Sequence, residues 1–207
     1  MEKSIVRGLM SAAVFAMATT AQSASVTPVF TDEGLVTTGG ATSTRVFSAD
    51  LTGLGISEIA AITVTDSNSG VGGSPGIYSG FDLDAIFLDL DGMLSTTADR
   101  VFADSFLFNV GTIRGGGSPV SPSGGPTNGS SSATTVDEAF ATLDAIDGIF
   151  FGAGSLSLGD GGSLTAIFDP GVPVGSTLFL FAGEVSGSAG EDITGLVEIS
   201  DLSLIHI

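Results

Sequence analysis

Four aspartates set close together are the residues of this sequence best suited to chemistry. Asp82 and Asp84 stand two apart, and Asp89 and Asp91 stand two apart just before a glycine. Calcium takes several hard oxygen ligands, and carboxylates spaced in this way around a turn can converge on one ion. We therefore predict a calcium site made of Asp82, Asp84, Asp89 and Asp91.

A second interpretation of the same stretch needs no metal. Leu83–Leu90 is an apolar run typical of a strand, and Asp91-Gly92 would then be an acidic turn that leads into the next strand. The EF-hand loop does not fit here. Placing its glycine on Gly92 puts Phe87 at the first ligand position and Ala98 where a bidentate acid belongs. Both interpretations stay open.

Most catalytic chemistries are excluded by composition. The chain has no cysteine, its one histidine is His206, and its one lysine is Lys3. These facts leave no thiol nucleophile, histidine-based triad, zinc site or lysine-dependent loop. Two carboxylates alone can still hydrolyse a glycoside. Sugar clefts usually offer aromatic platforms, however, and the chain has no tryptophan and one tyrosine. We predict that the protein is not an enzyme, with a carboxylate-pair glycoside hydrolase as an alternative.

The charge balance narrows the choice of partners. The chain has 23 acidic and 5 basic residues. Removing Glu2, Lys3 and Arg7, which lie in the first segment, leaves 22 acids against three arginines, a net charge of −19. Such a field repels phosphate backbones, so we exclude nucleic acid as a partner. It favours cations, or simply solubility outside a cell.

Alternating apolar runs between Gly, Ser and Asp turns predict an all-β fold, an antiparallel β-sandwich of jelly-roll type. The expected strands are 43–49, 58–65, 83–90, 100–108, 149–158, 163–168, 176–185 and 193–200. Ser155–Phe168 has the pattern of a hairpin around Gly159–Gly162. The run Thr177–Ala182 is apolar on both faces, as a central covered strand would be, with Phe179 and Phe181 opposite Leu178 and Leu180.

One short helix is expected at 136–145, because Thr135 and Glu138 match a capping box and Val136, Ala139, Phe140 and Leu143 would share one face. The Gly/Ser/Pro-rich segment 115–132 precedes it and predicts a mobile loop. We expect a single domain over 26–201.

Both ends of the chain carry signals of their own. Residues 1–25 have a basic start and the apolar stretch Leu9–Ala18, too short to span a bilayer, and predict a secretory signal peptide cleaved after Ala21, Ser23 or Ser25. Leu202–Ile207 coincides with the translation of a transposon adaptor used in sequencing libraries. We therefore expect this tail to be artefactual and the native sequence to be cut near Asp201.

Three phrases resemble the body of bacterial PEP-CTERM surface proteins: Gly76–Ile86, Ser155–Leu164 and Leu178–Glu184. The resemblance covers residues 26–201. The tail that defines the family (a Val-Pro-Glu-Pro motif, an apolar helix and a basic cluster) is absent, which a cut at the adaptor explains. The resemblance implies export, sorting by an exosortase and association with the envelope or exopolysaccharide matrix, and it implies no catalytic residues.

These observations predict a non-catalytic exported protein, structural or adhesive, on the surface or in the extracellular matrix of a bacterium. Its expected partners are extracellular polysaccharide or other surface proteins, and it would meet the membrane only through the missing C-terminal anchor. A calcium-dependent carbohydrate-binding module is the alternative, with calcium as its one candidate cofactor.

Overall fold

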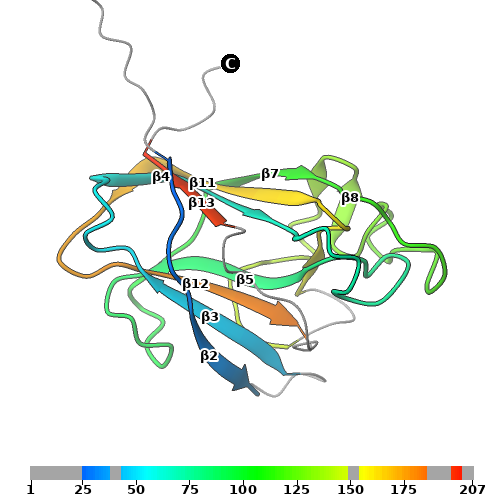
Figure 1. The fold of residues 1–207 in the computed structure, drawn as a ribbon, viewed down its shortest axis with the longest axis horizontal. Coiled ribbons are helices and arrows are strands. Elements are labelled where there is room, and N and C mark those ends of the chain that lie inside the picture. Colours follow the sequence, from blue (N-terminus) through cyan, green and yellow to red (C-terminus); the bar gives the residue numbers. More distant parts are fainter. Residues whose placement is uncertain (1–24, 38–42, 149–153, 186–196, 202–207) are drawn as a thin grey trace, which may run out of the picture.

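The computed structural model describes residues 25–37, 43–148, 154–185 and 197–201. These residues form two antiparallel sheets packed face to face, with a small two-stranded ribbon at one end (Figure 1). The predicted all-β sandwich is confirmed. Within the described ranges there is no helix, and hence none that is long and apolar enough to cross a membrane. The predicted signal peptide and C-terminal tail, except Ser25, lie outside the described residues.

The first sheet has five strands with β4 in the middle. Their order is β1 (Ser25–Val26), β13 (Val197–Ser200), β4 (Glu58–Thr65), β11 (Ser163–Pro173) and β7 (Ser105–Asn109). The predicted strand 58–65 is confirmed to the residue. The register of β11 against β4 shifts between Ile167 and Val172, so the long strand bends there and both of its ends stay paired.

The second sheet places β12 between β5 and β3. Its order is β10 (Leu156–Ser157), β5 (Asp82–Asp89), β12 (Phe179–Val185), β3 (Thr44–Asp50) and β2 (Thr31–Val36), with β6 (Arg100–Val101) on the far end of β5. Leu178 and Leu180 are fully buried between the sheets. Phe181 is buried and Phe179 half-buried in a different cluster. The predicted central strand is therefore confirmed.

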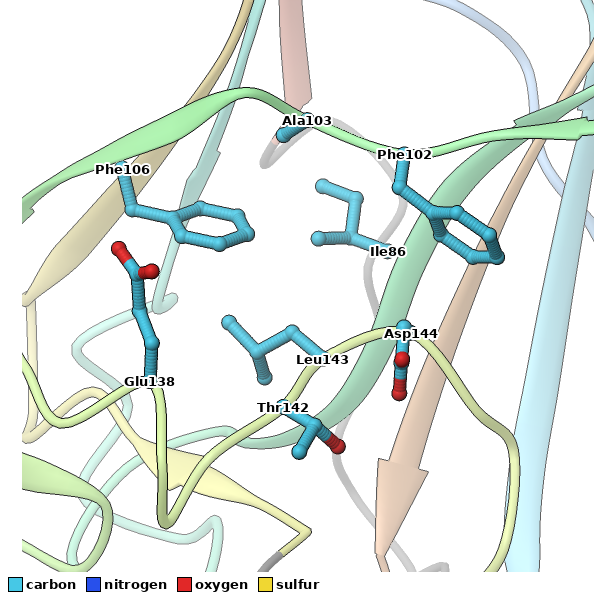
Figure 2. A pocket seen from close by; sticks show the side chains of 8 residues that line it. All are labelled: Ile86, Phe102, Ala103, Phe106, Glu138, Thr142, Leu143 and Asp144. Atoms are coloured by element: carbon cyan, nitrogen blue, oxygen red, sulfur yellow. The ribbon is translucent and has the colours of Figure 1, made fainter.

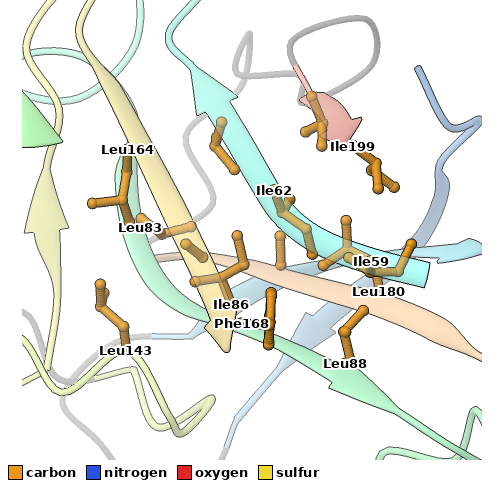
Figure 3. Close-up of a cluster of buried hydrophobic side chains, with 14 of the residues drawn as sticks. Ile59, Ile62, Leu83, Ile86, Leu88, Leu143, Leu164, Phe168, Leu180 and Ile199 are labelled. Atoms are coloured by element: carbon orange, nitrogen blue, oxygen red, sulfur yellow. The ribbon is translucent and has the colours of Figure 1, made fainter. Parts of the chain in front are cut away.

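The buried apolar residues fall into two groups. The main core fills the space between the sheets and contains Ile62, Leu88 and Phe168 (Figure 3). The outer cluster consists of Val46, Ala85, Phe87, Ile146 and Phe181, and Leu94 packs against it. The second sheet is thus apolar on both faces, which is why β5 is buried at every position.

The predicted helix at 136–145 is wrong. Val136 instead pairs with Ser130, joining β9 (Thr135–Val136) to β8 (Ser130–Ser132). The Thr135 hydroxyl accepts a hydrogen bond from Ser132 Oγ at 2.9 Å rather than capping a helix. A helix of ten residues is marginal by itself, and here burial of Leu143 in the main core outweighs the local capping signal.

The hairpin predicted for Ser155–Phe168 is also wrong. β10 pairs with β5 in the second sheet, whereas β11 pairs with β4 and β7 in the first. The turn at 159–162 therefore carries the chain from one sheet to the other. Leu156 and Leu164 still reach the same core, from opposite sides. An alternating pattern indicates which face is buried, but it does not identify the partner strand.

Two other predictions need adjustment. The single strand predicted at 100–108 is broken between β6 and β7, and the break crosses from the second sheet to the first. In the loop predicted to be mobile, residues 115–120 are exposed, but Asn128 is fully buried and donates its side-chain amide to Ser155 O at 3.0 Å. The later half of this segment is thus packed into the fold.

Candidate functional site

The four aspartates of the predicted calcium site do not lie together. Asp82 and Asp89 are the two ends of β5, and a strand rises about 3.3 Å per residue, so their backbones are roughly 23 Å apart. The structure groups Asp89 and Asp91 with Asp99 and leaves Asp82 and Asp84 at the opposite end of the strand. Any single ion can therefore take at most two of the four predicted ligands.

Asp82 and Asp84 hold the frame of the sandwich. Asp82 accepts a hydrogen bond from the Ser157 hydroxyl, which ties β5 to β10. One Asp84 oxygen accepts bonds from Thr44 Oγ1 at 2.5 Å and from the amides of Asp147 and Gly148 at 3.1 and 3.2 Å. Burial raises the pKa of Asp84, and the Thr44 hydrogen bond opposes that rise.

Asp89, Asp91 and Asp99 form the acidic triad, in which one carboxylate oxygen from each lies within 4.8 Å of the others. Asp89 is fully buried, Asp99 half-buried and Asp91 exposed. Asp89 Oδ1 accepts hydrogen bonds from the amides of Asp91 and Gly92 at 3.1 and 2.6 Å. The chain therefore turns tightly after β5, and the loop 90–99 brings Asp99 back beside the end of the strand.

Hydrogen bonds inside that loop fix the third carboxylate. Asp91 accepts from the amide of Met93 at 2.7 Å and from the Thr96 hydroxyl at 2.8 Å, and these bonds lower the pKa of Asp91. Burial, and after it the neighbouring charge of Asp99, raises the pKa of Asp89. Asp89 Oδ2 and Asp99 Oδ1 are buried and accept no hydrogen bond from the described residues. Hard carboxylate oxygens left open in this way suit a divalent cation such as calcium.

Arg100 lies against the triad and offsets part of its charge. Its Nε is 4.0 Å from Asp89 Oδ2, its guanidinium lies 4.3 Å from the centre of the Phe87 ring, and its Nη2 donates to Leu94 O at 2.8 Å. Phe87 in turn stacks on Phe181 with ring centres 5.6 Å apart. The arginine therefore closes the outer cluster, and the triad keeps a surplus of two negative charges.

A pocket of about 290 Å³ opens at the side of the sandwich, and we call it the lateral pocket. Its lining consists of Ile86, Phe102, Ala103, Phe106, Glu138, Thr142, Leu143 and Asp144 (Figure 2). Glu138 and Asp144 are exposed at its rim. The sequence interpretation missed this pocket, because it placed Glu138 in a helix cap and gave Phe102 and Phe106 no partner outside their strand.

No protein-family model, curated protein or solved structure matches this chain. The resemblance to PEP-CTERM proteins therefore stays a prediction. Fold and sites together define an acidic, two-sheet β-sandwich with an acidic triad at one end of β5 and the lateral pocket, part apolar and part acidic, beside the middle of that strand.

Proposed function

We propose that this chain is a non-catalytic surface or extracellular-matrix protein, structural or adhesive, which is exported and, as its resemblance implies, sorted by an exosortase. The observation that carries the proposal is that buried aspartates accept hydrogen bonds that hold loops to the sandwich. Asp66 accepts three backbone amides, those of Asn68, Phe81 and Gly161. Like Asp82 and Asp84, it holds loops to the sandwich, which favours a structural role for these carboxylates.

The glycoside hydrolase alternative has weaker support. Its two carboxylates would be Glu138 and Asp144, the pair at the lateral pocket. The general acid of such an enzyme has its pKa raised by its surroundings, commonly by burial, so that it is protonated when it acts. Both of these side chains are exposed to water.

Binding and catalysis can be separated in one experiment. The domain 26–201 is incubated with insoluble bacterial exopolysaccharides, and cosedimentation and release of reducing ends are both measured. We expect retention by at least one polysaccharide with no new reducing ends. Release of reducing ends that is lost in Glu138→Gln would overturn the non-catalytic assignment. Immunolabelling of bacteria that express the gene tests surface display: intact cells should be labelled, and label that is seen only after permeabilisation would contradict it.

A calcium-dependent carbohydrate-binding module is the second candidate, and the acidic triad is the observation that favours it. Calcium takes six to eight oxygen ligands, of which three carboxylates can supply up to six. The surplus of negative charge around Asp89, Asp91 and Asp99 would be neutralised by one divalent ion. We expect a dissociation constant of about 10⁻⁴–10⁻³ M, the range of extracellular calcium modules.

Thermal unfolding in calcium, magnesium and sodium at matched ionic strength tests this site. Calcium should raise the melting temperature more than either other cation, because magnesium requires tighter octahedral geometry and sodium acts only by screening. Asp99→Asn should remove the extra stabilisation, whereas the exposed Glu58→Gln, which loses the same charge on β4, should retain it. Equal stabilisation by sodium would leave the triad as an acidic turn. Polysaccharide retention that needs calcium would then distinguish the module from the structural protein.

A further inference from the structure

The lateral pocket lies where the edge of β5 loses its strand neighbours. β10 pairs with the start of β5, at Asp82 and Leu83, and β6 pairs with its end, at Leu88 and Asp89. Between them the amide of Ile86 donates to the carbonyl of Leu143 at 3.0 Å. A loop residue thus takes the place of a strand, and among the described residues this is the one backbone–backbone hydrogen bond across the gap. The space beside that bond is the lateral pocket.

Leu143 is held in a strained conformation at this point. Its φ is 56°, in the left-handed region that branched residues without a special reason avoid. Its side chain is nonetheless 1% exposed and packs in the main core. Strain of this kind persists only where the surrounding structure enforces it, and it clusters at binding sites. Here the left-handed conformation of Leu143 directs its side chain inward, while Thr142 and Asp144 stay at the rim (Figure 2).

The opposite wall carries two aromatic rings, Phe102 on the segment that crosses between the sheets and Phe106 on β7. Phe106 is half-buried, while Phe102 is 43% exposed. The Phe102 ring is set edge to face against Phe87, with ring centres 6.0 Å apart and planes at 64°. Because Phe87 is fully buried, this contact fixes an exposed aromatic ring beside the lateral pocket.

The rim has negative charge that no described side chain neutralises. The three arginines of the described residues are all paired elsewhere: Arg45 with Asp32, Arg100 with Asp89, and Arg114 with Asp160. No ion pair involves Glu138 or Asp144 within the described part of the chain. Figure 2 shows Glu138 toward the Phe106 end of the pocket and Asp144 toward the Phe102 end. A ligand that enters therefore meets carboxylates on two sides.

We propose that the lateral pocket binds a small organic ammonium ion with an apolar body. The body lies against Ile86, Leu143 and Phe106, and the ammonium group stays at the rim between the two carboxylates. The exposed Phe102 ring adds an attraction for the cation, since aromatic faces carry negative potential. A volume of about 290 Å³ is at the small end for ligand pockets and suits one ring with a short chain. This inference goes beyond the proposed function and does not depend on the acidic triad.

Three probes of one shape separate charge from hydrophobicity. We would titrate methyl-labelled protein with phenethylammonium, with 2-phenylethanol, which is neutral, and with phenylacetate, which is an anion. The cation should shift the methyl resonances of Ile86 and Leu143 in a saturable way and leave those of the distant Ile199 unchanged. The alcohol should bind several-fold more weakly, and the anion should cause no shift. These measurements use the unaltered protein, so they do not depend on the folding of a variant.

Matched variants locate the charge. Glu138→Gln with Asp144→Asn should weaken phenethylammonium about tenfold, the order expected for losing two exposed ion pairs. Glu58→Gln with Glu198→Gln removes the same charge from exposed positions on β4 and β13 and should leave the affinity unchanged. Equal affinity for the cation and the alcohol would overturn the proposal. So would equal losses in the two double variants, because the chain's overall field would then be the cause.

Discussion

Replacing Arg100 with methionine tests how the outer cluster and the acidic triad are held together. Methionine keeps the length of the side chain but loses three interactions that Arg100 makes at 9% side-chain exposure. The hydrogen bond to Leu94 O is from a charged donor, and such bonds contribute about 1.5–3 kcal/mol. The guanidinium over Phe87 adds roughly 0.5–2 kcal/mol.

The ion pair to Asp89 adds less than its burial suggests. At 4.0 Å it is at the outer limit for such a pair, and burial still leaves the pKa of Asp89 raised. Because the three interactions share one side chain, their contributions overlap. We expect Arg100→Met to lower the free energy of unfolding by about 2–4 kcal/mol at neutral pH.

Arg45→Met is the matched control. Its ion pair with Asp32 is much shorter, at 2.5 Å, but the two side chains are 32% and 42% exposed. Water screens such pairs, so we expect little change in stability. Urea unfolding followed by far-ultraviolet circular dichroism suits a chain without tryptophan. If the N–O distance of the ion pair decided its contribution, Arg45→Met would lose more stability than Arg100→Met. If burial of the pair decides it, Arg100→Met should lose more.

The pH dependence of this loss is a second test. Removing Arg100 leaves the buried Asp89 carboxylate without its neighbouring cation. The loss of stability in Arg100→Met should therefore become smaller as pH falls and Asp89 takes up a proton. Asp89→Asn in the Arg100→Met background should recover part of the loss at neutral pH. If Arg100→Met and Arg45→Met are equally mild, or if the loss is the same at every pH, Arg100 does not secure the triad in this way.

Three further predictions follow from the same sheet. Phe181→Ala should lower the free energy of unfolding by about 3–5 kcal/mol, because the side chain is 2% exposed and stacks on Phe87, and an unchanged urea midpoint would mean that the outer face is not covered. Gly92→Ala should destabilise the loop 90–99, since φ is 73° and an added Cβ would meet the Phe179 ring at 2.7 Å, and a melting temperature equal to wild type would contradict this. The contribution of Asp84 to stability should fall as pH rises from about 4, because its pKa is raised in the folded state above its ordinary 3.8, so the unfolded chain loses that proton first. Asp84→Asn should flatten the fall, which melting temperatures across pH 4–7 would check.

Buried strands such as β4 and β12 could be predicted because burial leaves a direct trace in the sequence. β4 was predicted with its exact bounds, and β12 was predicted as central from apolar residues on both faces. The choice of the neighbouring strand leaves no such trace in the sequence. Leu156 and Leu158 alternate with serines, and Leu164 resumes the apolar face after the glycine turn, in the manner of a hairpin. Leu156 and Leu164 nevertheless belong to different sheets. The side-chain period is the same for any partner, so only tertiary packing decides the pairing.

The grouping of the aspartates could be predicted only in part, for a related reason. Acids spaced by two residues along a strand share a face, but each pair of positions also moves them about 6.6 Å along the strand. Asp82 and Asp84 therefore separate from Asp89 as the strand extends. Asp99 joins the triad because hydrogen bonds to Asp91 fold the loop 90–99 back on itself. No periodic pattern in the sequence predicts that loop conformation. Spacing indicated an acidic site, and loop geometry selected its members.

One strand supports both candidate sites, and Phe87 is the residue that connects them. Its ring lies beneath the guanidinium of Arg100, which borders the triad, and edge to face with Phe102, which borders the lateral pocket. Other residues of β5 contribute to one site each: Ile86 lines the pocket, and Asp89 supplies a carboxylate to the triad. A core that had only to be apolar could accept leucine at position 87. An aromatic ring is favoured there because its face attracts the guanidinium and because it packs edge to face with a second ring, and leucine can do neither.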